Sequence, residues 1–162
     1  MNITVNPSDL RGSVEAPSSK SLTQRAIAAA ILTGGTTVIR NPSYCNDSLA
    51  AMRIAVELGA TVHRESDRIT VIAGKVPVGS LTLNCSESGL ALRMFAPLAA
   101  LLSASVTLTG EGSLARRPVT MISEALSQLG VNVETSGGLL PVKLTGELRA
   151  GRAFIDGSAG SQ

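Results

Sequence analysis

The stretch from residue 18 to residue 25 reads Ser-Ser-Lys-Ser-Leu-Thr-Gln-Arg, and an apolar run, Ala-Ile-Ala-Ala-Ala-Ile-Leu, follows it at residues 26–32. The apolar run predicts a helix that is buried on most sides. Lys20 and Arg25 then lie in the first turns of this helix, where the positive end of the helix dipole disfavours cations. Free backbone N–H groups, hydroxyls and two cations at one helix start favour a bound anion. We therefore expect an anion-binding site there.

The pattern around this helix returns along the chain at intervals of about 70 residues, which is typical of a repeat protein. The segment Gly12–Ala16 is matched by Gly79–Leu83 and again by Gly151–Ile155, and Arg25 with its helix is matched by Arg93 with a second apolar run. One unit is predicted as strand, helix, strand, helix, strand, strand. We expect repeat one at about 12–74, repeat two at about 79–146 and the start of a third repeat at 151–162.

The periodicity also predicts the individual elements. Apolar and amphipathic patterns indicate helices at 20–33, 47–58, 88–102 and 118–129, and strands at 12–16, 36–40 and 104–109. Gly59 and Gly130 follow two of the helices, where a left-handed residue ends a helix. Two closing hairpins turn at 65–67 and 136–138, and Phe154-Ile155 opens the third repeat. If the repeats pack around a pseudo-threefold axis, the starts of their first helices meet at one end of the domain.

Composition excludes several functional classes. The chain has 162 residues, 44% apolar and 16% charged, which indicates a folded domain with a sizeable core. Aromatic residues make up only 2% and the net charge is +2, so we expect no binding to single-stranded or duplex nucleic acid. Cys45 and Cys85 are far apart and His63 is the only histidine, so we expect no metal and two free thiols. We recognise no signal peptide or membrane-spanning segment and expect a cytoplasmic protein.

The third repeat breaks off before its helix. Natural domains seldom stop ahead of a core helix, so we expect the chain to be part of a longer protein, with a second domain absent. Apolar surface that the next helix would cover should then be exposed.

Five segments, in order, resemble the EPSP synthase (3-phosphoshikimate 1-carboxyvinyltransferase) family. They are Pro17-Ser18-Ser19-Lys20-Ser21-Leu22-Thr23-Gln24-Arg25-Ala26, Asn46-Asp47, Ser88-Gly89-Leu90-Ala91-Leu92-Arg93, Leu108-Thr109-Gly110 with Arg117-Pro118, and Asp156-Gly157-Ser158-Ala159-Gly160-Ser161-Gln162. The resemblance covers this whole chain but only the first two-fifths or so of a family member. It implies an inside-out α/β domain of repeated βαβαββ units, with helices buried and sheets outside.

The resemblance also implies an activity. The family joins shikimate 3-phosphate to phosphoenolpyruvate: the shikimate 5-hydroxyl attacks C2 of the enolpyruvate, and phosphate leaves through a tetrahedral intermediate. This reaction belongs to the shikimate pathway, which leads to chorismate and aromatic amino acids, and it needs no cofactor. The family's active site lies between two domains, so the partner of this chain would be the C-terminal domain of the same protein. Alone, the chain should be inactive.

Roles for single residues follow from the same resemblance. Lys20 corresponds to the lysine that contacts the target hydroxyl and the enolpyruvate phosphate, where it would stabilise developing charge. Ser21 and Arg25 correspond to the pair that binds the shikimate carboxylate, and a guanidinium can hold a carboxylate through two hydrogen bonds. Ser161 corresponds to a ligand of the shikimate phosphate, and Gln162 to a residue that contacts both substrates. A solvated lysine and a surface ion pair are the structural alternatives for Lys20 and Arg25.

The enolpyruvate side of the site falls in the second repeat. Gly89 corresponds to a glycine whose backbone approaches the enolpyruvate phosphate, and Arg117 to a direct ligand. Arg93 lies nearby in an apolar helix, which an unpaired cation would destabilise. We expect an anionic partner for it, Asp47 or Glu87. A simple turn at Gly89 and a structural ion pair at Arg93 are the alternatives.

The chain also departs from the family pattern. Ser18 replaces a glycine, Glu87 an asparagine, Leu90 a threonine and Gly160 a serine. Glu87 and Leu90 lie beside the enolpyruvate pocket, so we expect an altered response to the herbicide glyphosate. Two other functions stay open: a UDP-N-acetylglucosamine enolpyruvyl transferase, against which Lys20-Ser21 and Arg25 argue, and a non-catalytic anion-binding domain.

Overall fold

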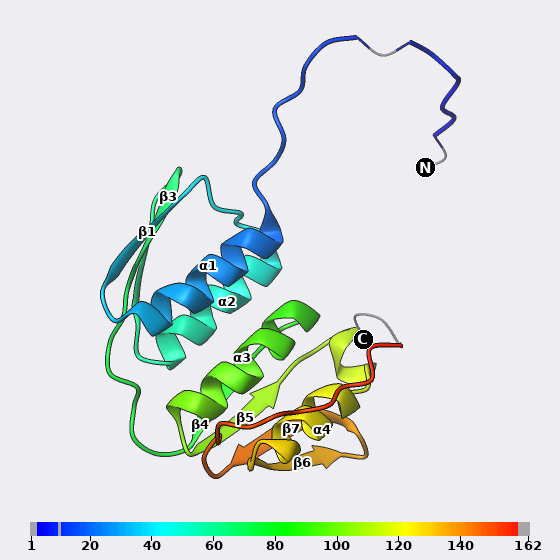
Figure 1. The fold of residues 1–162 in the computed structure, drawn as a ribbon. Coiled ribbons are helices and arrows are strands. Elements are labelled where there is room, and N and C mark those ends of the chain that lie inside the picture. Colours follow the sequence, from blue (N-terminus) through cyan, green and yellow to red (C-terminus); the bar gives the residue numbers. More distant parts are fainter. Residues whose placement is uncertain (1–2, 10, 159–162) are drawn as a thin grey trace.

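Helices and strands alternate along the chain in the computed structural model, which describes residues 3–9 and 11–158 (Figure 1). The first half contains α1 (Lys20–Thr33), β1 (Thr36–Arg40), α2 (Asn46–Glu57), β2 (Thr61–Arg64) and β3 (Arg68–Ile72). The second half contains β4 (Leu81–Asn84), α3 (Gly89–Leu102), β5 (Ser105–Thr109), the short 3-10 helix η1 (Leu114–Arg116), α4 (Thr120–Gln128), β6 (Asn132–Ser136) and β7 (Leu139–Thr145). The predicted helices are confirmed to within two residues at each end.

The strands form two separate sheets. The first has the order β1-β3-β2 and is antiparallel throughout. The second has the order β4-β5-β7-β6, with β4 parallel to β5 and the other pairs antiparallel. The last three strands of each half therefore follow the same order, β1-β3-β2 and β5-β7-β6. The elements from β4 to β7 reproduce the predicted strand, helix, strand, helix, strand, strand.

Two predicted strands are wrong. Residues 12–16 are exposed and not in a strand, and they belong to a segment that runs away from the body of the molecule (Figure 1). Phe154-Ile155 is not in a strand either. Its backbone pairs with one side chain: Phe154 N–H donates to Gln128 Oε1 at 2.9 Å, and Gln128 Nε2 donates to the Phe154 carbonyl at 3.0 Å. A strand needs a neighbouring strand along its edge, and neither segment has one within the described residues.

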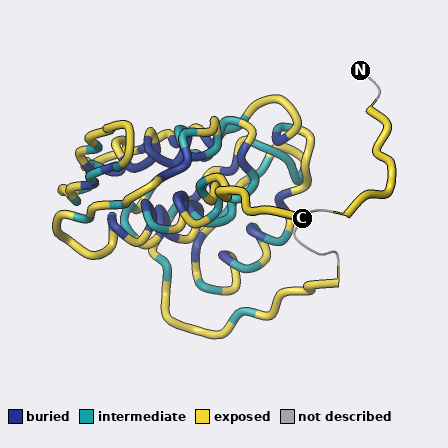
Figure 2. The backbone as a smooth tube through the Cα atoms, turned by 90° about the horizontal axis from the view of Figure 1, so that it is seen from above, coloured by how far each residue is buried: buried dark blue, intermediate teal, exposed yellow. Residues whose placement is uncertain are grey.

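The helices lie between the sheets and carry most of the core. Figure 2 shows the buried positions gathered along the middle of the molecule and the exposed ones in the connecting loops and at both ends. In β4 the buried Leu81 and Leu83 alternate with the exposed Thr82 and Asn84, so one face of this sheet meets the helices and the other meets solvent. Helices inside and sheets outside are thus confirmed.

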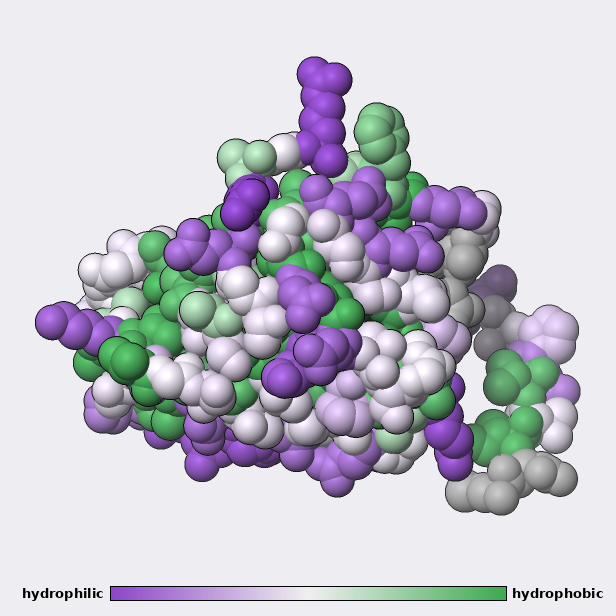
Figure 3. Space-filling model, turned by 90° about the horizontal axis from the view of Figure 1, so that it is seen from below, coloured by the Kyte–Doolittle hydropathy of each residue, from purple (hydrophilic) through white to green (hydrophobic). Residues whose placement is uncertain are grey.

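Less of the surface of α1 is buried than predicted. Its buried residues lie on one face, against α2 and α3, whereas Leu22 and Leu32 are 67% and 54% exposed. No third helix covers the other face among the residues that the structure describes. Seen from below, the surface shows small apolar areas separated by hydrophilic side chains (Figure 3).

Two glycines end helices as predicted. Gly59 follows α2 with φ +90°, and Gly130 follows α4 with φ +89°. Gly59 is also confined by contact, because a Cβ there would overlap the carbonyl of Lys75. A side chain at this position would therefore meet both backbone strain and a collision.

Candidate functional site

The start of α1 is fixed by hydroxyl groups. Ser19 caps the helix by accepting a hydrogen bond from Leu22 N–H at 3.3 Å. The buried Thr23 hydroxyl donates to the Ser19 carbonyl at 2.9 Å and accepts from Ser43 N–H at 2.9 Å. Because Ser43 belongs to the loop that leads into α2, these bonds hold the two helix starts together.

Lys20, in the first turn of α1, forms an ion pair across this junction. Its Nζ lies 2.9 Å from Oδ2 of Asp47, which is in the first turn of α2. The hydrogen bond and the negative charge of Asp47 raise the pKa of Lys20 above its ordinary value. The lysine is about half exposed, so the pair adds little to stability. Its effect is to hold a protonated amine at the helix start.

Ser21 and Arg25 follow on the same helix, four residues apart. Ser21 is half-buried and Arg25 is exposed. Arg25 has no ion-pair partner among the described residues. Its guanidinium is thus available to an anion from solution.

The start of α3 resembles that of α1 and contacts it. Ser88 caps α3 by accepting from Ala91 N–H at 3.2 Å, and its hydroxyl donates to Gln24 Oε1 at 3.0 Å. Ser88 and Gln24 are both fully buried. In Figure 1 both helices begin at the same end of the molecule. Two of the three expected helix starts therefore meet as predicted.

Two arginines flank Gly89 at this second helix start. A Cβ added at Gly89 would lie 3.3 Å from Arg93 Nη1 and 3.4 Å from Arg117 Nη1. Arg93 is half-buried on α3, and Arg117 is exposed directly after η1. The guanidinium groups border a hollow of about 20 Å³ with apolar walls that include Leu92 and Leu114. Like charges gathered at a helix start make a binding site for an anion.

The predicted partner of Arg93 is wrong. Asp47 pairs with Lys20, and Glu87 Oε2 accepts a hydrogen bond from Ser113 N–H at 3.2 Å. In the described part of the chain, neither Arg93 nor Arg117 has a carboxylate within ion-pair distance. A carboxylate also forms strong, charge-assisted hydrogen bonds with backbone N–H groups.

Ser161 and Gln162 lie outside the described residues. Just before them, Ser158 N–H donates to Asp156 Oδ1 at 2.9 Å. This hydrogen bond lowers the pKa of Asp156, and it gives Ser158 a structural role in a turn.

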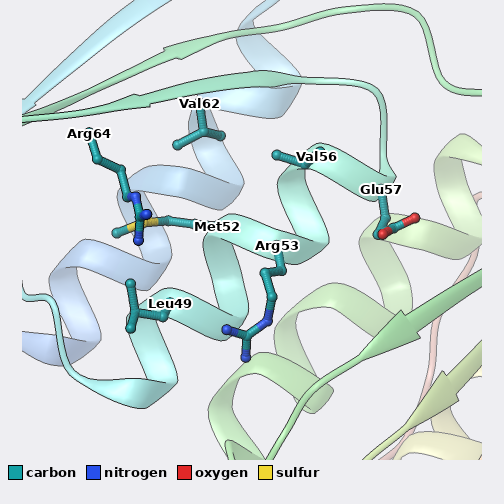
Figure 4. Close-up of a pocket in the computed structure, with 7 residues that line it drawn as sticks. All are labelled: Leu49, Met52, Arg53, Val56, Glu57, Val62 and Arg64. Atoms are coloured by element: carbon teal, nitrogen blue, oxygen red, sulfur yellow. The ribbon is translucent and has the colours of Figure 1, made fainter.

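Sequence reasoning missed Gln24 and Arg53. Gln24 stands between Thr23 and Arg25 in the polar first turns of α1, so the sequence did not set it apart from its neighbours. Nothing in the sequence indicated a role for Arg53. Its Nη2 donates a hydrogen bond to Ser86 Oγ at 2.8 Å, which links α2 to the loop before α3. Arg53 also lines an open groove of about 410 Å³, together with Leu49, Met52, Val56, Glu57, Val62 and Arg64 (Figure 4). Figure 4 shows Arg64 extending from β2 toward Met52.

The described residues contain no group of three or more His, Cys, Asp or Glu side chains that could hold a metal ion. Within the same residues, no helix has both the length and the apolar character to cross a bilayer.

Comparison with known proteins identifies the family. The family model for EPSP synthase (3-phosphoshikimate 1-carboxyvinyltransferase) matches residues 5–162. The chain belongs to the EPSP synthase family. Curated relatives named 3-phosphoshikimate 1-carboxyvinyltransferase include those of Methanocorpusculum labreanum, 37% identical over all of this chain, and Aeropyrum pernix, 37% identical over 99% of it.

These EPSP synthase relatives are much longer. The chain spans 39% of the M. labreanum protein and 37% of the A. pernix protein. A solved EPSP synthase from Acinetobacter baumannii superimposes on 85% of this chain with a TM-score of 0.75 and 25% identity, and the match covers 32% of that structure. The fold of the chain is therefore that of an enolpyruvyl transferase.

Proposed function

We propose that this chain supplies one side of the active site of a 3-phosphoshikimate 1-carboxyvinyltransferase. The observation that carries the proposal is the pair Arg93 and Arg117, which flank Gly89 without a carboxylate partner among the described residues. The Gln24–Ser88 hydrogen bond places this pair beside the helix start that bears Lys20. Two adjoining cationic sites suit a reaction that joins two anions.

In this proposal the two substrates divide between the two helix starts. Arg25 and Ser21 bind the carboxylate of shikimate 3-phosphate, because a guanidinium forms two parallel hydrogen bonds with a carboxylate. Gly89 and Arg117 bind phosphoenolpyruvate, and Arg93 adds a second positive charge beside them. Ser161 is a ligand of the shikimate phosphate, and Gln162 contacts both molecules.

Lys20 acts at the junction between the substrates. The shikimate 5-hydroxyl loses its proton as its oxygen bonds to C2 of the enolpyruvate. The C2=C3 double bond becomes a single bond as C3 gains a proton, which gives a tetrahedral intermediate. Loss of a proton from C3 and cleavage of the bond between C2 and the phosphate oxygen then release phosphate and the enolpyruvyl ether. The ammonium of Lys20, kept protonated by Asp47, stabilises the charge that develops on the hydroxyl and phosphate oxygens.

The other side of the site comes from a C-terminal domain that corresponds to the remaining length of the relatives. That domain would contribute acid–base groups, each commonly worth about 10²–10⁴-fold in rate. The complete protein would act in the cytoplasm in the formation of chorismate. Residues 1–162 alone should bind substrate without turning it over.

Calorimetric titration of residues 1–162 with shikimate 3-phosphate, and separately with phosphoenolpyruvate, tests this function. Arg25→Ala should lower the affinity for shikimate 3-phosphate, and Arg117→Ala the affinity for phosphoenolpyruvate. Each loss should be about tenfold or more, because each variant loses a charge-assisted hydrogen bond. Arg116→Ala is the matched control, since Arg116 is an exposed arginine next to Arg117 and should change neither affinity.

Equal binding by the wild-type chain and both arginine variants would contradict the proposed roles. Phosphate release by the purified chain in the presence of both substrates would contradict the assignment of acid–base groups to another domain.

A further inference from the structure

Two loops meet at the proposed enolpyruvate site. One joins β4 to α3 and ends at Gly89, the first residue of α3, and the other follows β5 and carries Arg117. Their backbones are bonded twice: Cys85 N–H donates to the Thr109 carbonyl at 2.8 Å, and Glu111 N–H donates to the Ser86 carbonyl at 2.8 Å. The distance between Gly89 and Arg117 thus depends on how these loops fit together.

Glu87 makes a third contact between the same loops. Its Oε2 accepts from Ser113 N–H at 3.2 Å, and its carboxylate lies against Gly112. A Cβ added at Gly112 would overlap that carboxylate, and the φ of Gly112 is +56°. No lysine or arginine of the described chain forms an ion pair with Glu87. The carboxylate is therefore held by the turn at Gly112-Ser113.

The contact continues from this turn to Arg117. The Ser113 hydroxyl accepts a hydrogen bond from Arg117 Nη2 at 3.4 Å, while Nη1 of the same guanidinium faces Gly89. On the inner side of the loop, Leu114 is buried in the core. Leu114 thus anchors the loop in the core, and Glu87 is bonded to its outer turn.

We propose that Glu87 is a positioning residue that holds the Gly112-Ser113 turn and thereby keeps the Arg117 guanidinium beside Gly89. The inference rests on the proposed phosphate-binding role of Gly89 and Arg117. It explains why a carboxylate stands next to an anion site. The charge of Glu87 opposes anion binding, and its hydrogen bond favours binding, so the two effects have opposite signs and can be separated.

Two substitutions at Glu87 separate them. Glu87→Gln removes the charge but keeps a side-chain oxygen that can accept from Ser113 N–H, whereas Glu87→Ala removes both. Titration of residues 1–162 with inorganic phosphate, followed by NMR, should give Glu87→Gln an affinity equal to or above wild type. Glu87→Ala should bind about two- to thirtyfold more weakly. Tighter binding by both variants would show that Glu87 acts only as a charge and would overturn the inference.

A pair of glycines gives a test that leaves every charge unchanged. Gly112→Ala displaces the Glu87 carboxylate and should weaken phosphate binding as Glu87→Ala does. Gly137→Ala is the control, because Gly137 has a similar φ of +61° but has no atom within 4 Å of an added Cβ. Equal affinities of the two glycine variants would contradict the inference.

The position of Arg117 can also be followed without a ligand. The Nε–Hε resonance of Arg117 should shift in Glu87→Ala and stay near its wild-type position in Glu87→Gln. If the wild-type chain bound no phosphate, the proposed function would lose its site, and this resonance would decide the inference alone. An unchanged resonance in Glu87→Ala would overturn it.

Discussion

At the scale of single residues, the two thiols lie in opposite environments. Cys85 is fully buried, and burial raises the pKa of its thiol to about 12. Cys45 is exposed at the start of α2. Partial burial acts to raise the pKa of Cys45, but hydrogen bonds with Ser43 and Ser48 outweigh it and lower the pKa below its ordinary value. Only the thiolate is nucleophilic, so the two cysteines should differ widely in reactivity.

Alkylation with iodoacetamide at pH 8 tests this difference. At this pH a thiol of pKa about 12 is ionised to about one part in ten thousand. We expect one label per folded chain, at Cys45, and a second only after unfolding in denaturant. Cys45→Ser should remain unlabelled while folded, and two labels on the folded wild-type chain would contradict the prediction. Mass spectrometry of the intact chain gives the count.

Single residues also show where sequence reasoning stops. The family pattern predicted Lys20, Gly89 and Arg117 as site residues, because each belongs to a short motif, and their roles stay predictions. The expected ion pair between Arg93 and Glu87 is wrong because the Glu87 carboxylate accepts from Ser113 N–H, and Ser113 comes after another strand in the sequence. The expected effect of Leu90 on glyphosate binding stays a prediction.

At the scale of elements, the two helix caps differ in what surrounds them. Ser19 is exposed and makes one capping bond, whereas Ser88 is fully buried and bonds to both Ala91 and Gln24. Gln24 Nε2 already has no partner among the described residues. Loss of the Ser88 hydroxyl would leave the Gln24 oxygen without a donor as well.

We therefore expect Ser88→Ala to lower the free energy of unfolding by about 2 kcal/mol or more, because the lost helix cap and the unpaired buried oxygen each destabilise the fold. Ser19→Ala should cost about 1 kcal/mol. Urea unfolding followed by circular dichroism measures both. Similar losses for the two variants would show that the Gln24 contact contributes nothing.

The elements differ in how far sequence specifies them. The helices were predicted closely because their apolar periodicity is local to each segment. The strands at 12–16 and 154–155 were wrong because strand formation depends on a neighbour that is distant in sequence. The burial of α1 on most sides was wrongly predicted for the same reason, because an apolar run does not show how many elements will pack against the helix.

At the scale of the whole molecule, the N-terminal segment and the body behave as separate parts. Residues 3–9 and 11–17 are exposed and extend away from the helices (Figure 1). Exposed extended segments are the preferred sites of proteolysis. Limited trypsin digestion should therefore cut after Arg11 before any site between Lys20 and Lys143.

The digestion product should begin at Gly12 and keep the helical circular dichroism of the intact chain. Arg11→Gln should delay the first cut, and N-terminal sequencing identifies it. An initial cut within α1 or α2 would mean that these helices open more readily than their packing indicates.

The arrangement of the sheets has a consequence for how the protein is made. The strands of the first sheet all lie within residues 36–72, and those of the second within residues 81–145. A chain that leaves the ribosome from its N-terminus can therefore close its first sheet before the second has been synthesised. The Gln24–Ser88 hydrogen bond crosses from one half to the other. During synthesis, the two helix starts that bear Lys20 and Arg93 would accordingly come together only after the second half has been made.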